Sequence, residues 1–457
     1  MLNEKLYELK NWKSVIHTTW NPKGPGVIRI HMIPPKFRLF GTAPSVVILN
    51  GQDILPLNES WAILLTEFIN RVNAYGPHEM DEETLQGVLN DVFHQMRKVY
   101  PNVPNKQMQE DLEIIMDTFE AVIHGEIPQQ EIGLLSIGEY APHMTAPHRM
   151  DLMVSAMTKN GSWHCNQKCL HCYAAGQSLS ETEELSTKEW KEIIAACRKA
   201  KIPQLTFTGG EPTLREDLCE LIAEAKWFVT RLNTNGVLLT PALCQSLMEA
   251  ELDSVQVTFY SADKAVHNEL VGAETFDKTV DGIKNALAAG LNLSINTPLC
   301  SKNKDYKKTL EFLKELGVEY VTCSGLIVTG NATKESSTAT QLTSDEIYET
   351  VKEAADYCFA NGMEINFTSP GWISEDKLRK MGLDVPSCGA CLSNMAVTPN
   401  GKVIPCQSWL GGEILGDMKT DRFSKIWNHP ACKKHRAFSA KMDQTCPLRG
   451  KAGTTKC

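Results

Sequence analysis

The chain has 457 residues, of which 42% are hydrophobic, and this length is enough for about three domains with packed cores. A formal net charge of −9 leaves no basic excess for neutralising phosphates, so we expect no nucleic-acid partner. No apolar run approaches membrane-spanning length, and the start, Met1 to Lys5, is not a cationic, apolar leader, so we expect no membrane partner. The 15 cysteines therefore predict a cytoplasmic protein with metal-bound thiolates rather than disulfides.

Residues 1–125 are predicted to form a small α+β domain. Apolar or alternating runs at 26–32 and 45–49 predict two strands, and helices are predicted from Asn58, Asp81 and about Lys106. Strands followed by helices resemble the winged-helix element that binds the leader of a precursor peptide, in which an exposed strand edge accepts an extended peptide. The alternative is a domain that only covers the rest of the protein. Residues 126–157 are predicted to be a linker.

Three cysteines, Cys165, Cys169 and Cys172, occur with the spacing CxxxCxxC. Three thiolates on a tight loop can hold three irons of a [4Fe–4S] cluster and leave the fourth iron free to bind a small molecule. The spacing resembles the signature of the radical S-adenosylmethionine (SAM) enzymes, in which the free iron binds SAM and electron transfer yields a 5′-deoxyadenosyl radical. The resemblance places His171 and Tyr173 beside the cofactor, with His171 at the family's aromatic position. A zinc site or buried core thiols are the alternatives.

A second short motif with glycines and a carboxylate follows the cysteines. Residues 202–208 predict a buried strand that leads into the run Gly209, Gly210, Glu211 and Pro212. Glycines let the backbone close around a ligand, and a carboxylate accepts hydrogen bonds from an ammonium group. The run resembles the GGEP motif of radical SAM enzymes, in which the backbone and the glutamate bind the methionyl amino group of SAM.

Residues 158–375 are predicted to form an α/β core. Predicted strands alternate with amphipathic helices, the strands near 228–232, 254–260, 291–297, 319–323 and 363–367, and the helices near 187–200, 216–226, 240–250, 275–289, 304–316 and 343–360. This alternation predicts a parallel sheet, which periodicity alone also allows to be open and doubly wound. The radical SAM resemblance implies a partial (β/α)6 barrel with ligands at the carboxyl ends of the strands. It also implies that SAM is bound by residues at those ends: Asn233, Asn235, Ser261, Asn296 and Leu326.

Residues 376–457 contain a second set of cysteines. Cys388 and Cys391 precede a predicted hairpin with a turn at Asn400 and Gly401 that leads to Cys406. These intervals resemble a SPASM domain, which carries auxiliary iron–sulfur clusters in peptide-modifying radical SAM enzymes. The dense CxxC group of a full SPASM tail is missing here, so we expect at least one complete auxiliary [4Fe–4S] cluster. Its expected ligands are Cys388, Cys391, Cys406 and Cys446, with Cys457 as the substitute, whereas Cys432 is expected to be a core residue.

Together the resemblances imply a radical SAM enzyme that abstracts a hydrogen atom from a ribosomally made precursor peptide. The implied partners are the precursor with its leader and a reductase, flavodoxin or ferredoxin as electron donor. We expect a thioether or C–C cross-link, because the cysteine-rich tail supplies an electron acceptor. Epimerisation is an alternative, with Cys323 at the end of a predicted strand as hydrogen-atom donor. Sulfatase-maturase-type modification, small-molecule cofactor biosynthesis, and a non-catalytic electron carrier or redox sensor are further alternatives.

Overall fold

The computed structural model of the chain describes residues 2–20, 27–35, 44–51, 53–76, 80–123, 126, 133–442 and 445–449. The chain forms two compact units. One comprises Met1–Ala146 with Arg198–Pro203, and the other comprises Pro147–Cys197 with Gln204–Cys457. None of the helices in the described ranges combines the length and apolarity needed to cross a bilayer.

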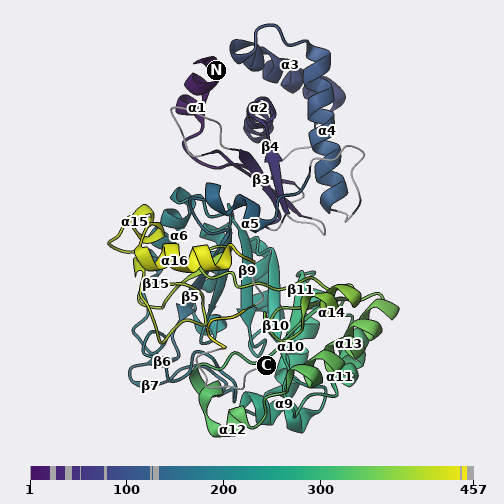
Figure 1. The fold of residues 1–457 in the computed structure, drawn as a ribbon, viewed down its shortest axis with the longest axis vertical. Helices are drawn as coiled ribbons and strands as arrows, with labels where there is room; N and C mark the ends of the chain where they lie inside the picture. The colour runs from purple at the N-terminus through teal and green to yellow at the C-terminus, as the bar shows by residue number, and fades with distance from the viewer. Residues whose placement is uncertain are drawn as a thin grey trace. The chain divides into compact units, whose positions relative to one another are not determined.

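The N-terminal unit is an antiparallel sheet followed by three helices (Figure 1). After helix α1 (Leu2–Asn11), its four strands pair in chain order: β1 (Ile16–Trp20), β2 (Ile28–Ile33), β3 (Ser45–Leu49) and β4 (Asp53–Leu57). The helices that follow are α2 (Glu59–Tyr75), α3 (Glu82–Val99) and α4 (Asn105–Ile123). Asn58 Oδ1 accepts from the Trp61 N–H at 2.9 Å, and Asp81 Oδ1 accepts from the Thr84 N–H at 2.8 Å. Helices α2 and α3 therefore begin where the sequence predicted, because both have polar N-caps.

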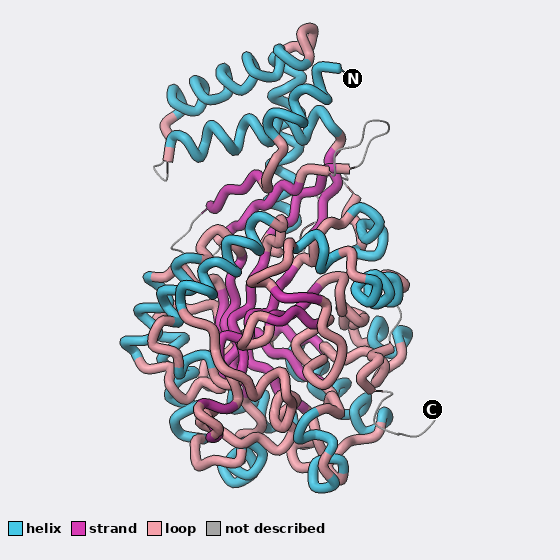
Figure 2. Tube along the Cα trace, turned by 90° about the vertical axis from the view of Figure 1, so that its left-hand side faces the viewer, coloured by secondary structure: helices cyan, strands magenta, loops and turns pink. Residues whose placement is uncertain are grey.

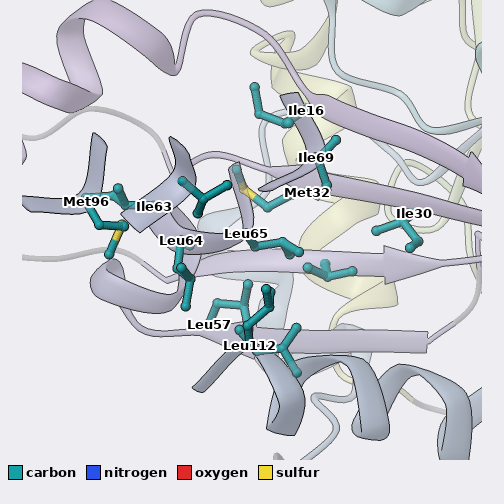
Figure 3. Packing of buried hydrophobic residues seen from close by; sticks show 14 of the residues in the cluster. Ile16, Ile30, Met32, Leu57, Ile63, Leu64, Leu65, Ile69, Met96 and Leu112 are labelled. Atoms are coloured by element: carbon teal, nitrogen blue, oxygen red, sulfur yellow. The ribbon is translucent and has the colours of Figure 1, made fainter. Parts of the chain in front are cut away.

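The N-terminal unit has a hydrophobic core of its own. Ile30 and Met32 of β2 belong to one buried cluster with Leu57 of β4 and Leu65 of α2 (Figure 3). The sequence analysis did not predict α1, β1 or β4. Strand β4 contains Pro56, which removes a ladder donor and is tolerated because β4 lies at the edge of the sheet.

The second unit is built on a sheet with the order β13-β12-β11-β10-β9-β8-β5-β14-β15-β16. Neighbouring strands from β13 to β5 are parallel: β5 (Arg149–Ser155), β8 (Gln204–Gly209), β9 (Val229–Thr234), β10 (Ser254–Thr258), β11 (Leu293–Pro298), β12 (Tyr320–Ser324) and β13 (Glu364–Phe367). In Figure 2 these strands gather in the middle of the unit, with helices around them. Strands β8 to β13 occupy the six predicted positions, and the α/β prediction with a parallel sheet is confirmed.

Strand β5 lies within the segment 126–157 that the sequence analysis assigned to a linker. It pairs in parallel with both β8 and β14, and Met150 and Leu152 are fully buried. The structure therefore places residues 149–155 inside the sheet rather than in a connection. The strand was missed because Asp151 interrupts its apolar run and Pro147 stands just before it.

Helices link the parallel strands along the chain: α6 (Thr187–Lys199), α7 (Leu218–Glu224), α8 (Pro241–Glu249), α9 (Lys264–Val271), α10 (Phe276–Ala288), α11 (Tyr306–Glu315), α12 (Glu335–Thr338), α13 (Ser344–Ala360) and α14 (Glu375–Lys380). The smaller elements are α5 (Ile137–Tyr140), β6 (Thr158–Lys159) and β7 (Ser162–Trp163). The C-terminal segment adds β14 (Asn394–Val397), β15 (Lys402–Ile404), β16 (Gly416–Asp417), α15 (Phe423–Trp427) and α16 (Pro430–Ser439). The predicted hairpin is β14–β15, and Gly401 in its turn has a φ of 89°.

Candidate functional site

The two faces of the parallel sheet differ in chemistry. Residues on one face, such as Val255, Val257 and Val321, are apolar and fully buried. The alternate residues are polar, many of them partly exposed, and the strand register places them side by side on what we call the polar face: Asp151, Thr206, Arg231, Asn233, Gln256, Asn296, Tyr320, Thr322 and Asn366. A parallel sheet covered on both faces is apolar on both. The polar face is therefore suited to line solvent or a ligand.

The loop that carries Cys165, Cys169 and Cys172 is held from two sides. The Lys168 N–H donates to Val271 O at the end of α9 over 2.9 Å. On the other side, the Asn331 side chain donates to Cys169 O over 3.2 Å, and the Asn331 N–H donates to Cys172 O over 2.9 Å. The segment after β12 thus fixes the carbonyls of two of the three predicted cluster ligands.

The three thiols of this loop lie within electrostatic range of one another. Burial raises the pKa of Cys165 to about 12, and it raises the pKa of Cys169 well above its usual range, with further contributions from the neighbouring thiolates. Burial also raises the pKa of Cys172. Buried thiols of this kind ionise when a metal supplies the compensating positive charge. Their spacing, burial and proximity therefore fit a cluster held by three cysteines.

The GGEP run lies at the carboxyl end of β8. A Cβ on Gly209 would collide with Ser155 O, and a Cβ on Gly210 would lie 2.7 Å from Ala156 O, so the end of β5 requires both glycines. Pro212 is buried and begins a short 3₁₀ turn.

Glu211 is buried beside the cysteine loop. Its Oε1 accepts from the Thr213 N–H at 3.0 Å and from Thr234 Oγ1 at 2.6 Å, and its Oε2 accepts from the Asn235 N–H at 2.8 Å. Burial raises the pKa of Glu211, whereas these hydrogen bonds act in the opposite direction. The carboxylate is thus positioned within electrostatic range of Cys165. Its contact with the amino group of SAM stays a prediction.

The other residues predicted to bind SAM are brought to the carboxyl edge of neighbouring strands. Asn233 lies on the polar face of β9, and Asn296, two residues before the end of β11, accepts from Thr322 Oγ1 at 3.0 Å. Ser261 accepts from the Asp263 N–H at 3.1 Å, and Leu326 packs in a cluster near the cysteine loop. Their contacts with SAM stay predictions.

Asn235 has a more specific structural role than the sequence indicated. Its Nδ2 donates to Asn166 Oδ1 in the cysteine loop over 2.6 Å, and its Oδ1 accepts from the Val237 N–H at 3.0 Å. The amide therefore links the cysteine loop to the turn after β9, which makes Asn235 a positioning residue in the structure.

The auxiliary cysteines form a second group of thiols. Cys388, Cys406 and Cys446 share a small apolar cluster with Trp409. Burial raises the pKa of Cys406 to about 12, and the thiolates of Cys388 and Cys446 add to this. Cys391 lies within electrostatic range of Cys406, so the four expected ligands lie in one region of the second unit, and their binding of a cluster stays a prediction. Cys457, the substitute ligand, lies outside the described residues.

Cys432 is a buried residue of α16 that also contacts this group. The Cys391 thiol hydrogen-bonds to Cys432, which raises the pKa of Cys391 and lowers that of Cys432. Arg436 Nη1 donates to Cys432 Sγ over 3.4 Å. The sequence analysis expected Cys432 to be a core residue, and it is buried, but no local spacing signal links it to Cys391.

Comparisons with known proteins agree with this geometry. Residues 163–313 match the radical SAM superfamily, and residues 388–449 match the SPASM iron–sulfur cluster-binding domain. The chain contains a radical SAM domain and a SPASM domain. The two domains confirm the predicted cofactors, a SAM-binding [4Fe–4S] cluster, SAM and at least one auxiliary cluster, and they confirm the assignment to the radical SAM enzymes.

The radical SAM protein resembles relatives with different substrates. A probable GTP 3′,8-cyclase of Sulfurisphaera tokodaii is 38% identical over 164 residues, which are 34% of this chain and 50% of that protein, so the match spans half of the relative. Streptococcus suis SuiB bound to precursor peptide SuiA has a TM-score of 0.58 at 14% identity, covering 86% of this chain and 87% of that one. The protein anSMEcpe with AdoMet and Kp18Cys peptide has a TM-score of 0.52 at 19% identity, covering 64% and 84%. These two likenesses show a shared fold.

Two aromatic side chains, His171 and Tyr260, lie beside the radical SAM cysteines. His171 was predicted; its Nε2 lies 2.8 Å from Thr340 Oγ1, and burial lowers its pKa to about 4, so the ring is neutral at neutral pH. Tyr260 was missed, although it directly precedes Ser261. Burial raises the pKa of Tyr260, and the thiolates of Cys169 and Cys172 add to this. The sequence signal that could have revealed Tyr260 was an aromatic residue at the end of the predicted strand 254–260.

Cys323 does not lie on the polar face. Its neighbours in β12, Thr322 and Ser324, take the polar-face positions, whereas Cys323 is fully buried and within electrostatic range of Cys358 on α13. Because side chains alternate along a strand, Cys323 lies on the opposite, apolar face of the sheet, which packs against the helices. This placement argues against the alternative in which Cys323 faces the cavity as a hydrogen-atom donor.

Proposed function

We propose that this radical SAM protein installs a thioether or C–C cross-link in a ribosomally made precursor peptide. When bound, the two clusters and SAM supply a 5′-deoxyadenosyl radical that takes a hydrogen atom from a peptide carbon, and an acceptor for the electron released later. A cross-link removes two hydrogens from the peptide, one as an atom and one as a proton accompanied by that electron. The protein's own task is to hold the peptide between the two sets of thiols.

The observation that carries this proposal is the position of Tyr173. Burial raises the pKa of Tyr173, and thiolates on both sides contribute, Cys172 of the radical SAM loop and Cys406 of the SPASM domain. One side chain is thus within electrostatic range of both predicted cluster sites. The hydroxyl of Tyr173 also hydrogen-bonds to Thr208 of β8. Radical formation and electron removal can therefore act on a substrate held beside the same residue.

The polar face supplies groups that suit a peptide backbone. Gln256 Nε2 lies 3.3 Å from Thr322 Oγ1, and Asn366 Nδ2 donates to Tyr320 OH over 3.0 Å. Amide and hydroxyl groups with remaining capacity can pair with peptide N–H and C=O groups. The N-terminal unit provides the means for leader recognition, since β1 and β4 are edge strands to which an extended peptide can add.

A small-molecule substrate is the second candidate, and the similarity to a probable GTP 3′,8-cyclase favours it. That similarity covers 164 residues and leaves the four-stranded N-terminal unit without a task. A peptide substrate gives both units a function, so we favour it.

The experiment is to incubate the anaerobically reconstituted protein with SAM, a reductant and short peptides encoded beside its gene, in deuterated water. A cross-linked product loses two hydrogens by mass spectrometry. An epimer keeps its formula and gains deuterium at the altered carbon, and that outcome would replace the cross-link by epimerisation. Cleavage of SAM with every candidate peptide left unchanged would favour the small-molecule candidate.

Deleting residues 1–125 tests the proposed leader recognition. We expect precursor binding to weaken by several kcal/mol, because the peptide loses a main-chain ladder and side-chain pockets together. SAM cleavage without peptide should persist. Equal precursor affinity of the truncated and full-length proteins would leave the N-terminal unit as a covering domain.

A further inference from the structure

One layer of the polar face, by which we mean a row of residues aligned across neighbouring strands, contains charged side chains. The register aligns Asp151 of β5 with Thr206 of β8, and Thr206 with Arg231 of β9, so the three residues lie side by side. Asp151 and Thr206 are almost fully buried, and Arg231 is partly exposed. Arg149 lies two residues before Asp151 on the same face.

The charges of this layer do not balance. Arg149 Nε lies 2.8 Å from Asp151 Oδ1, so this pair is neutral overall. Burial lowers the pKa of Arg231, and the neighbouring Arg149 guanidinium adds to this effect, whereas Asp151 opposes it. The residues that the register places beside Arg231 are the uncharged Thr206 of β8 and Ser254 of β10, and Tyr320 of β12 opposes the lowering of its pKa together with Asp151. Two guanidinium groups thus share one carboxylate, which leaves one positive charge.

The same layer contains polar atoms that lack hydrogen-bond partners. Within the described part of the chain, Arg231 Nε and Thr206 Oγ1 are buried without a partner, as is Asn233 Oδ1 one layer along β9. Burying such groups without a partner costs free energy, and an unpaired buried charge costs more. Three of them on two neighbouring strands indicate a place for a polar ligand.

We propose that Arg231, supported by Arg149 and Thr206, binds a carboxylate of the substrate peptide. This inference rests on the proposed function and deepens it by naming a substrate feature. A guanidinium group matches a carboxylate in its planar two-point geometry, and a single negative charge balances the single positive charge of the layer. The carboxylate belongs to an Asp or Glu side chain or to the peptide's C-terminus.

The position of this subsite connects it to the reaction. Asp151 lies within electrostatic range of both Tyr173 and Cys406. Thr208, which hydrogen-bonds to Tyr173, is two residues after Thr206 on β8. A carboxylate anchored at Arg231 therefore places the neighbouring part of the peptide beside Tyr173, where the two thiol groups approach each other.

The test uses the full-length, anaerobically reconstituted protein with SAM and three acetylated tripeptide probes. The first is acetyl-Ala-Glu-Ala-amide, the second is its Gln analogue, and the third is acetyl-Ala-Ala-Ala with a free C-terminal carboxylate. Binding is measured by ligand-observed NMR. The variants are Arg231→Gln and Arg231→Lys, and the control is Arg379→Gln on α14, whose side chain is 68% exposed.

We expect the Glu probe or the free-carboxylate probe to bind about tenfold more tightly than the Gln probe, and the stronger of the two identifies the source of the carboxylate. Arg231→Gln should remove this preference, Arg231→Lys should keep part of it, and Arg379→Gln should leave it unchanged. Equal binding of all three probes to the unaltered protein, or a preference that survives in folded Arg231→Gln, would overturn the proposal. If Arg231→Gln fails to fold, Arg231→Lys and the unaltered protein decide. SAM cleavage, measured on the same samples, separates this outcome from a failure of the proposed function.

Discussion

The carboxylate of Glu211 has a structural role in addition to its predicted contact with SAM. Both oxygens face backbone N–H donors, Thr213 N–H on Oε1 and Asn235 N–H on Oε2. A backbone donor cannot turn away or accept in return. The site therefore requires acceptors at both positions, which a carboxylate provides and a carboxamide does not.

Glu211→Gln should accordingly lower the free energy of unfolding by about 1–3 kcal/mol, because its NH₂ group must face one of the two N–H donors. SAM affinity should fall as well, since the negative charge opposite the predicted ammonium group is lost. Chemical denaturation and equilibrium dialysis with labelled SAM measure the two effects. The matched control is Glu220→Gln, whose carboxylate is 57% exposed and pairs with Lys191; it should cost less than about 1 kcal/mol. Unchanged SAM affinity in Glu211→Gln would refute the predicted contact.

The placement of Cys323 gives a second test at this scale. Cys323→Ala should lower the free energy of unfolding by about 1 kcal/mol, because it leaves a small cavity between β12 and the helices. The mass of the peptide product should stay the same. Cys219→Ala on α7, at a partly exposed position, is the control and should change neither quantity. A product that appears only when Cys323 is intact, with solvent deuterium incorporated, would restore its role as hydrogen-atom donor.

Residues differ in how readily the sequence reveals them. Cys165, Cys169 and Cys172 are ligands of one loop, so their spacing along the chain already carries the geometry. Arg231 is different, because its proposed role depends on Asp151, which is 80 positions away in the sequence and lies near it only because β5 and β9 both pair with β8. Contacts between strands that are distant in sequence have no local signature.

Helices and strands also differ in how readily the sequence reveals them. The strands β8 to β13 were predicted because apolar runs bounded by turns are typical of parallel sheets. Helix α9 was missed, although it begins with Asp263 as N-cap and ends at Gly272 with a φ of 63°. Its eight residues are short for a periodicity argument. Its C-terminal end nevertheless fixes the cysteine loop through a backbone hydrogen bond, so this short helix supports the predicted cluster site.

The segment after β12 gives the prediction at the scale of elements. Gly330 has a φ of 57°, and a Cβ there would collide with Tyr173 O and lie 2.6 Å from Cys172 O. Gly330→Ala should therefore push this segment away from the cysteine loop, reducing the iron retained after reconstitution and SAM cleavage in parallel. Gly290→Ala is the matched control, because Gly290 has a φ of 77° and nothing lies within 4 Å of an added Cβ.

Both substitutions carry the same backbone strain of about 1–2 kcal/mol, so stability alone does not separate them. The difference lies in iron content, measured by colorimetric analysis and by the visible absorbance of the cluster. Equal iron retention in Gly330→Ala and Gly290→Ala would show that the segment after β12 does not hold the loop in place.

At the scale of the whole molecule, the two units differ in whether they contain predicted cluster ligands, as well as in their packing. The described residues of the N-terminal unit have a core of their own around β2, β4 and α2. The predicted cluster ligands all lie in the second unit. A ligand that binds only the folded form of one unit stabilises that unit, and it affects another unit only if the two unfold together.

Removal of the clusters should therefore lower the transition temperature of the second unit and leave that of the N-terminal unit almost unchanged. In the reconstituted protein we expect the transition of the second unit to lie roughly 5 °C or more above its position in the metal-free protein, because cluster binding is coupled to folding. The transition of the N-terminal unit should move by less than about 1 °C, since none of the expected ligands belongs to it. Scans at one fixed rate on both forms, with near-ultraviolet circular dichroism to assign the transitions, measure this. Cys169→Ala should show a smaller shift, because the auxiliary ligands remain, whereas Cys197→Ala, which removes a buried thiol of α6, should shift both forms equally. A single transition that moves as a whole on reconstitution would show that the two units unfold as one, and that loss of iron also unfolds the proposed leader-binding sheet.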